Sequence, residues 1–149
     1  MHFEDVDIGT RFVVGERVVT EQDLLGFAEI SGDRHPVHVD AGWAARSPFG
    51  QRIAHGPLGI ALAIGLFGRI EAFRDTALAM TDVSEWRFRA PIHIGDVLSL
   101  EVVIEGKRTT RSGQGVIERR LRLLKADGTV AQEGCSGMLI ARRGEESGS

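Results

Sequence analysis

The chain has 149 residues, of which 42% are hydrophobic and 26% charged, values typical of one globular domain. Its formal net charge of −3 gives no broad basic surface, so we expect no nucleic-acid partner. The single cysteine, Cys135, excludes an internal disulfide and suits a reducing compartment such as the cytoplasm. The start of the chain lacks the features of a signal peptide, and the most apolar run, residues 56–68, is too short to cross a bilayer. We therefore expect no membrane association.

The first part of the chain predicts a strand followed by a capped helix. Residues 11–20, RFVVGERVVT, carry valines on both sides of a Gly-Glu pair, which indicates a strand or a short hairpin. Thr20 and Asp23 have the spacing of a capping box, and apolar residues at helical spacing follow. Gly32 suits the left-handed position that ends a helix. Asp33 is therefore expected just beyond the end of this helix.

The next segment is expected to be irregular until a buried helix begins. Pro36 restricts the residue before it, so residues 33–38 are not expected to form a regular helix. Asp40 can cap one short helical turn. Pro57 suits the first position of a helix, and residues 56–68 are apolar on nearly every side. This helix should therefore be surrounded by other elements.

The second half of the chain has the period of strands. Trp86 and Phe88 alternate with charged residues, as in a strand with one buried face. Three more strands are expected between residues 97 and 142, with a hairpin turn at Asp127-Gly128. Cys135 follows the pattern of the last strand and is expected to be small and buried. The order of elements favours a single α+β domain whose antiparallel sheet curls around a central apolar helix.

One constellation of residues has the chemistry for proton transfer. Asp33 and His38 lie on either side of Pro36, so a bent loop can bring both side chains to one water molecule. His55 and Gly56 begin the buried helix, where unpaired backbone N–H groups and the helix dipole favour a developing negative charge. An acid, a base and an oxyanion site are the groups that proton transfer beside a carbonyl requires.

At these residues the sequence resembles a known family. Residues 32–58, GDRHPVHVDAGWAARSPFGQRIAHGPL, are similar to the MaoC-like, or (R)-specific enoyl-CoA hydratase, branch of the hotdog superfamily. Residues 87–98, RFRAPIHIGDVL, resemble the family's strand and Pro-x-x-x-Gly-Asp turn. The likeness extends to about residue 141, and it implies a hotdog domain over residues 1–141 followed by a polar tail over residues 142–149.

The resemblance also implies an activity. Hydratases of this family add water reversibly to a trans-2-enoyl thioester of coenzyme A or acyl carrier protein, giving the (3R)-hydroxyacyl thioester. Asp33 and His38 match the residues that hold the water, and the backbone N–H of Gly56 matches the oxyanion donor. No metal and no cofactor are implied, because coenzyme A is part of the substrate. The family forms its pocket between two protomers, so a homodimer or a larger homo-oligomer is expected.

Other polar residues allow more than one interpretation. His35 replaces the family's usual asparagine, and with His55 and Leu58 it is a candidate for substrate binding. A structural role for His55 is the favoured alternative. Four arginines could bind coenzyme A phosphates or simply be solvated: Arg87, Arg89, Arg108 and Arg111. Asp33, His35, His38 and Asp40 have spacings that zinc could use, but Pro36 disfavours a metal site.

Two other functions compete with hydration. A hotdog acyl-CoA thioesterase would need a carboxylate facing the thioester carbon, and would not need both Asp33 and His38. A non-catalytic acyl-CoA-binding subunit of a heteromeric dehydratase would tend to lose one of these two residues, whereas both are present here. The sequence does not determine the acyl group of the substrate.

Overall fold

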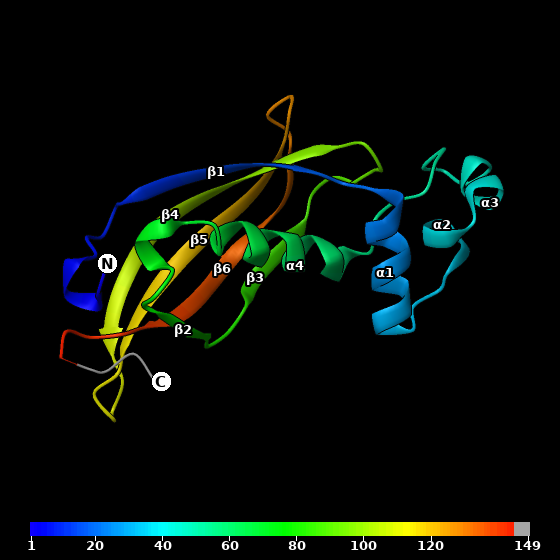
Figure 1. The fold of residues 1–149 in the computed structure, drawn as a ribbon. Coiled ribbons are helices and arrows are strands. Elements are labelled where there is room, and N and C mark those ends of the chain that lie inside the picture. Colours follow the sequence, from blue (N-terminus) through cyan, green and yellow to red (C-terminus); the bar gives the residue numbers. More distant parts are fainter. Residues whose placement is uncertain (145–149) are drawn as a thin grey trace.

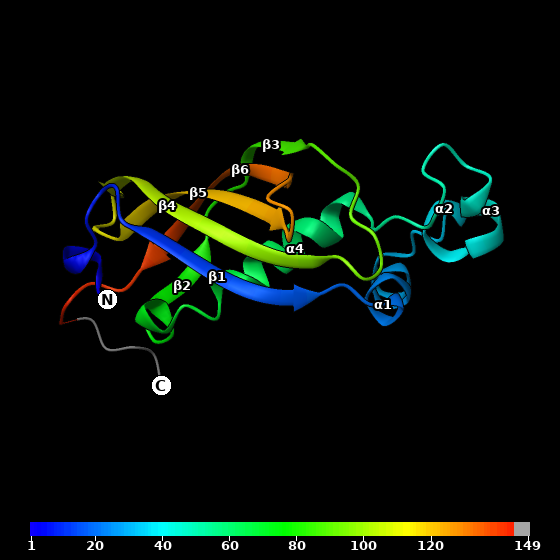
Figure 2. The same ribbon diagram turned by 90° about the horizontal axis from the view of Figure 1, so that it is seen from above.

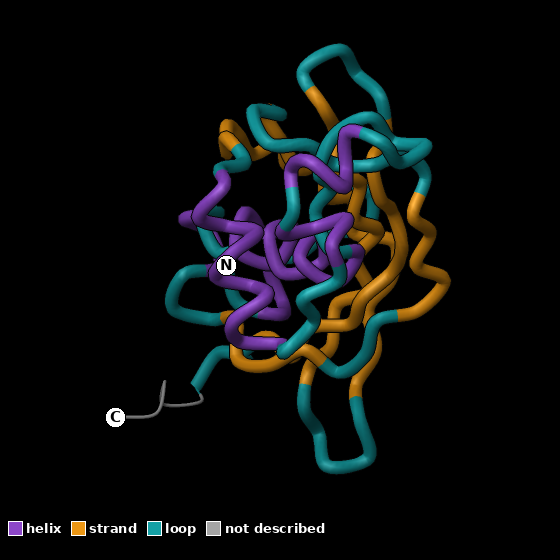
Figure 3. Tube along the Cα trace, turned by 90° about the vertical axis from the view of Figure 1, so that its right-hand side faces the viewer, coloured by secondary structure: helices purple, strands orange, loops and turns teal. Residues whose placement is uncertain are grey.

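The computed structural model describes residues 1–144, in which a six-stranded antiparallel sheet bends around helix α4 (Gly56–Phe67). Figures 1 and 2 show α4 lying along one face of the sheet, and Figure 3 shows the strands curving around it. The strands are β1 (Arg11–Val18), β2 (Ala77–Met80), β3 (Ser84–Phe88), β4 (Val97–Thr109), β5 (Gly115–Lys125) and β6 (Val130–Ile140). The other helices are α1 (Glu21–Ser31), α2 (Pro36–Val39) and α3 (Ala41–Ala45), with two 3-10 turns, η1 (Phe3–Asp5) and η2 (Glu71–Phe73). This is the predicted α+β architecture.

The strand order is β1-β4-β5-β6-β2, and β3 also pairs with β6. β2 pairs with the last residues of β6, from Met138 to Ile140, whereas β3 pairs with residues 132–135. One edge of the sheet is therefore built from two short strands placed end to end. The sequence predicts four strands after the central helix and misses β2, because Ala-Leu-Ala-Met is short and lacks an alternating pattern.

The core lies between α4 and the sheet. β4 alternates buried and partly buried residues along most of its length, which turns every second side chain towards the helix. The fully buried side chains of this face include Leu98, Leu100, Val102 and Ile104 from β4 and Leu121 and Leu123 from β5. Burying a side chain of this size contributes about 1.5–3 kcal/mol, so the face holds α4 firmly against the sheet.

The local signals of the first half are confirmed, with two corrections. Thr20 and Asp23 form the capping box of α1, and Gly32 ends this helix with a φ of 77°. Residues 11–18 form one continuous strand with an irregularity rather than a hairpin. Residues 36–39 form one helical turn, although no helix was expected there, because Pro36 stands at its start, where a missing N–H costs nothing.

Two expectations about strand burial are wrong. Phe88 is 59% exposed, because β3 lies at the open edge of the sheet. Cys135 is only partly buried, because Gln132, Ser136 and other even-numbered residues of β6 take the buried positions on its inner face. Burial still raises the pKa of the Cys135 thiol.

The helices α1, α2 and α3 gather at the end of the molecule where α4 begins, and the N-terminus and the end of β6 lie at the opposite end (Figure 1). Arg142 and Arg143 bind Glu4 and Asp5 of η1. Of the predicted polar tail, residues 145–149 lie outside the described residues. No helix within residues 1–144 is both long and apolar enough to cross a membrane.

Candidate active site

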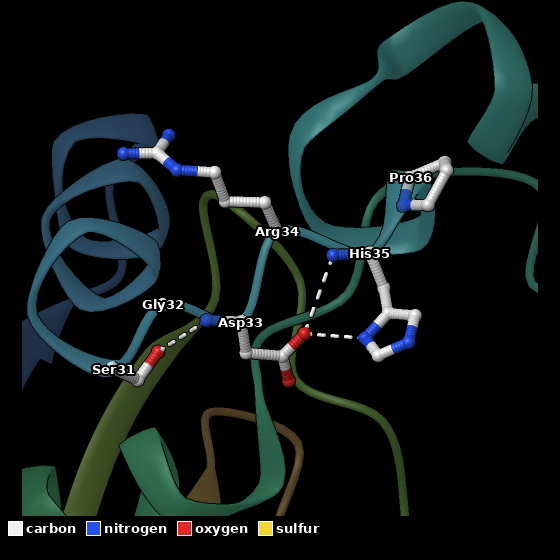
Figure 4. A pocket seen from close by; sticks show the side chains of 6 residues that line it. All are labelled: Ser31, Gly32, Asp33, Arg34, His35 and Pro36. Atoms are coloured by element: carbon white, nitrogen blue, oxygen red, sulfur yellow. Dashed lines mark hydrogen bonds and ion pairs between the residues drawn. The ribbon is translucent and has the colours of Figure 1, made fainter.

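Asp33 is held by the turn that follows α1. The left-handed Gly32 redirects the chain, and the Asp33 N–H then donates to Ser31 Oγ at 3.1 Å. Asp33 Oδ1 accepts the backbone N–H of His35 at 3.2 Å, an Asx turn, and also contacts the His35 ring nitrogen Nδ1 (Figure 4). These two hydrogen bonds, from the side chain and then the backbone of His35, lower the pKa of Asp33. The carboxylate is therefore the form present near neutral pH.

His38 is the third residue of α2 and is 9% exposed. Its Nδ1 donates to the carbonyl oxygen of Ile53 at 2.7 Å, because a carbonyl can only accept. In the neutral ring, Nε2 then carries the free lone pair, and it lies 3.8 Å from Asp33 Oδ2. The Ile53 N–H donates in turn to the carbonyl oxygen of Val37 at 3.1 Å, so the loop before α4 fixes both the tautomer and the direction of the His38 ring.

His55 lies beneath this pair and is only 1% exposed. Its ring stacks on His38 with centroids 3.8 Å apart, and Phe27 packs against it. Nε2 donates to the backbone carbonyl of Asp33 at 2.9 Å. Burial lowers the pKa of His55, so the ring is neutral near pH 7. His55 thus joins the start of α4 to the loop that carries Asp33.

Gly56 is the first residue of α4 and lines a cavity of about 360 Å³. The cavity wall is mostly apolar and consists of Phe49, Ile53, Ala54, Gly56, Phe88, Arg89, Ala90, Pro91, Ile92 and Gln132. The first N–H groups of a helix have no partner within the helix, and the dipole makes this end positive. The wall can therefore accommodate an apolar group, and the start of the helix can stabilise a negative charge beside it.

A second pocket, of about 490 Å³ and open to solvent, is lined by residues 31–36 (Figure 4). The carboxylate of Asp33 points towards the His35 ring, whereas the Arg34 side chain points the other way, towards α1. Both cavities have the volume of ordinary small-molecule sites.

The geometry of the two histidines fits a metal ion poorly. One ligand atom from each of Asp33, His38 and His55 lies within 4.8 Å of the others. An imidazole binds a metal through a lone pair in the plane of its ring, at about 2.0–2.1 Å for zinc. The two rings are stacked at 3.8 Å with only 22° between their planes, so their lone pairs run side by side and do not converge. The arrangement is better suited to proton transfer.

The remaining candidate residues are distributed as follows. The His35 side chain is exposed, and Leu58 is 6% exposed and packs in the core against the sheet. Asp40 caps α3, because its carboxylate accepts the N–H of Trp43 at 2.9 Å.

The four candidate arginines lie in different places. Arg89 lines the cavity beside Gly56 and pairs with Glu133, whereas Arg87 is exposed on β3. Arg108 pairs with Glu118, near the β4–β5 turn that carries Arg111, at the end of the sheet far from Asp33 (Figure 1).

Two groups in and around the site are not found from the sequence. The backbone carbonyl of Ile53 sets the tautomer of His38, and no sequence signal identifies it. Gln132 is 3% exposed on the inner face of β6 and binds the carbonyl of Gly56. A polar residue at an inward position of a strand is the signal that could have identified Gln132.

A curved antiparallel sheet that wraps one helix, with Asp33 and His38 close together beside the start of that helix, defines a hotdog domain with a candidate acid–base site. The profile of the family described as the MaoC-like domain matches residues 6–125, so the chain belongs to the MaoC-like family. This confirms the family and the hotdog fold that the sequence predicts.

Named relatives agree with this assignment. The chain is 36% identical over 105 residues to a 3-hydroxybutyryl-CoA dehydratase of Methylorubrum extorquens, a match that covers 70% of this chain but only 64% of that protein. It is 32% identical over 109 residues to an (R)-specific enoyl-CoA hydratase of Rhodospirillum rubrum, covering 70% of each chain. The solved structure of the (R)-hydratase PhaJ1 of Pseudomonas aeruginosa superposes with a TM-score of 0.79 and 28% identity, over 95% of this chain and 86% of that one.

Proposed function

We propose that the protein reversibly hydrates a trans-2-enoyl thioester to the (3R)-hydroxyacyl thioester. The observation that carries this proposal is the 3.8 Å separation between Asp33 Oδ2 and His38 Nε2. A water molecule has hydrogen-bond partners at about 2.8 Å, so one water can bind both atoms at the same time. The fixed tautomer of His38 leaves Nε2 ready to accept a proton from that water.

In the reaction, the site takes one proton from the water and returns one proton to the substrate. The water oxygen bonds to C3 of the substrate while His38 Nε2 takes a proton from it, and the carbon–carbon double bond shifts to give an enolate. C2 of the enolate takes a proton back from the Asp33–His38 pair, so the site returns to its starting state. No cofactor enters, because the thioester itself activates the double bond.

The thioester oxygen gains charge as the enolate forms. The N–H of Gly56 is our candidate donor to this oxygen, since Pro57 has no N–H to give. One such donor typically contributes about 3 kcal/mol to lowering the barrier. His55 keeps this donor beside the acid–base pair, because its ring stacks on His38 and binds the backbone of Asp33.

The names of the relatives support the reaction class. They include a 3-hydroxybutyryl-CoA dehydratase, an (R)-specific enoyl-CoA hydratase and a 3-hydroxyacyl-thioester dehydratase of Mycobacterium tuberculosis. We propose the same substrate class here, an acyl thioester of coenzyme A or acyl carrier protein.

Replacing Asp33 with Asn and His38 with Gln tests the mechanism. Each change should lower the rate of hydration of a short enoyl-CoA at least about 100-fold, because each removes one partner of the water. Hydration is followed by the loss of the conjugated enoyl absorbance, and thiol release from the same thioester is followed in parallel. Asp75→Asn changes an exposed carboxylate outside the site and should retain full activity. Thiol release without hydration would instead identify a thioesterase, and full activity in both variants would exclude the mechanism.

We also propose that two copies of the chain pair through the edge formed by β2 and β3. This edge exposes four apolar side chains, Leu78, Met80, Val83 and Phe88, which are 40–59% exposed. Phe88 also lines the cavity at Gly56, so a partner bound along this edge would close that cavity. An open, apolar sheet edge is a usual site of pairing between chains.

A further inference from the structure

A buried glutamine on β6 connects the edge strand β3 to the start of α4. Gln132 is 3% exposed, and its Nε2 donates to the carbonyl oxygen of Gly56 at 3.1 Å. Its Oε1 accepts the indole N–H of Trp86 at 3.0 Å. The three residues come from β3, β6 and the first position of α4, so the contact ties two strands to one end of the helix.

The direction of both hydrogen bonds is fixed by chemistry. The indole nitrogen of Trp86 can only donate, and the carbonyl of Gly56 can only accept. Gln132 therefore has a single amide orientation that satisfies both neighbours. The hydrogen bond from Trp86 fixes the orientation of the Gln132 amide, and the fixed amide then holds the carbonyl group of Gly56.

The space for this contact depends on two glycines. A Cβ at Gly59, one turn into α4, would overlap the amide of Gln132. A Cβ at Gly134, two residues along β6, would overlap the Trp86 ring. Both glycines have ordinary φ values, so it is the space that a side chain would need, and not the backbone conformation, that favours glycine here.

Gly56 is confined from a second direction. A Cβ at Gly56 would lie 2.9 Å from the Phe88 ring, so this ring rests against the glycine. A helix start that follows a loop frays unless something holds it, because its first N–H groups have no partner in the helix. Gln132 and Phe88 supply this restraint.

We infer that Gln132 is a positioning residue for the oxyanion donor Gly56, and that Trp86 acts through Gln132. The inference rests on the proposed function, in which Gly56 donates to the thioester oxygen. A displacement of about 1 Å in such a donor can cost about 100-fold in rate. The oxygen gains its charge in the transition state, so loss of this positioning should lower kcat more than it changes KM.

The test replaces Gln132 with Met, which keeps the length of the side chain but removes both hydrogen bonds, and Trp86 with Phe. With a short enoyl-CoA, we expect Gln132→Met to lower kcat about 10- to 100-fold with KM changed less than about threefold. Trp86→Phe should cause a smaller loss. In the double variant, Trp86→Phe should add little to the loss from Gln132→Met, because the indole no longer has a partner to orient.

Two controls separate positioning from general loss of stability. Ser136→Ala removes another buried, hydrogen-bonded side chain from the same face of β6, remote from Gly56, and should lower the thermal midpoint without changing kcat. Gly59→Ala should reproduce the kcat defect by displacing Gln132. Gly65→Ala on the same helix should not, because nothing lies within 4 Å of its added methyl group.

The outcomes are distinct. If the wild-type protein hydrates enoyl-CoA and Gln132→Met keeps the wild-type kcat, the inference fails while the proposed function stands. If the wild-type protein does not hydrate any enoyl thioester, the proposed function fails first. If Gln132→Met does not fold, Gly59→Ala and Trp86→Phe carry the test, and normal kcat in both overturns the inference.

Discussion

His35 shows how a single exposed side chain can set the working range of the site. It donates to Asp33 from its ring and its backbone, and these bonds are the main reason that the pKa of Asp33 is low. The asparagine that the family usually has at this position can also donate from its side chain. A residue without a donor would leave the carboxylate with only the backbone hydrogen bond.

We therefore predict that His35→Ala raises the pKa of Asp33 towards its ordinary value. The lowered pKa keeps the wild-type carboxylate ionised down to lower pH, so the variant should lose the ionised form at higher pH. An NMR titration of the Asp33 carboxyl group should therefore show a higher midpoint in His35→Ala than in the wild-type protein. His35→Asn should keep the wild-type midpoint. An unchanged or lower midpoint in His35→Ala would contradict this role of His35.

A buried arginine side chain joins β5, β6 and α4 in the core. Arg119 of β5 is fully buried, and it binds the carbonyl and the hydroxyl of Ser136 on β6 at 3.2 and 2.7 Å. Its guanidinium also lies over the ring of Phe67 on α4, 4.4 Å from the centroid. Its Nη1 has no hydrogen-bond partner within residues 1–144, and burial lowers the pKa of Arg119 to about 10.

Replacing Arg119 with Met should leave the free energy of unfolding unchanged or raise it. A buried charge with an unsatisfied N–H contributes little net stability, and apolar replacements of similar shape are often neutral or stabilising by about 1–4 kcal/mol. Arg119→Ala leaves a cavity and should cost about 2–5 kcal/mol. Urea unfolding of both variants measures the difference. A loss in Arg119→Met as large as that in Arg119→Ala would show that the charge itself stabilises the fold.

The boundaries of several helices and turns could be predicted, because they depend on residues that are close together in the sequence. The capping box at Thr20, the left-handed Gly32 and the turn at Gly128 each depend on residues close in sequence, and all are present. The site is only partly local. Asp33 and His38 are only five residues apart, whereas the stacking of His38 on His55 and the bond from Gln132 to Gly56 join residues 17 and 76 positions apart. Only the folded sheet brings such residues together.

At the scale of the whole molecule, the two edges of the sheet differ. β1 forms one edge, and β2 with β3 forms the other, which lies beside the cavity at Gly56. A second chain on the β2–β3 edge would cover apolar side chains and the mouth of the cavity together. Stable pairing usually buries about 800 Å² on each partner.

We predict that Leu78→Lys disrupts the proposed dimer. A lysine on an edge strand opposes pairing, because its charge would have to be buried. Size-exclusion chromatography with light scattering should show a monomer, and hydration should fall because the cavity loses one wall. Val13→Lys places the same charge on the exposed face of β1 and should remain dimeric and active. A monomeric wild-type protein, or a dimeric Leu78→Lys variant, would contradict the predicted interface.

The two glycines that make room for the glutamine and the indole have a consequence for the history of this sequence. Positions 59, 86, 132 and 134 form one spatial unit, since a methyl group at either glycine would occupy space that a side chain of the unit already fills. Substitutions at these four positions should therefore be correlated among homologous sequences. Homologues with alanine at position 59 should also have exchanged the glutamine, while those that keep glutamine and tryptophan should keep both glycines.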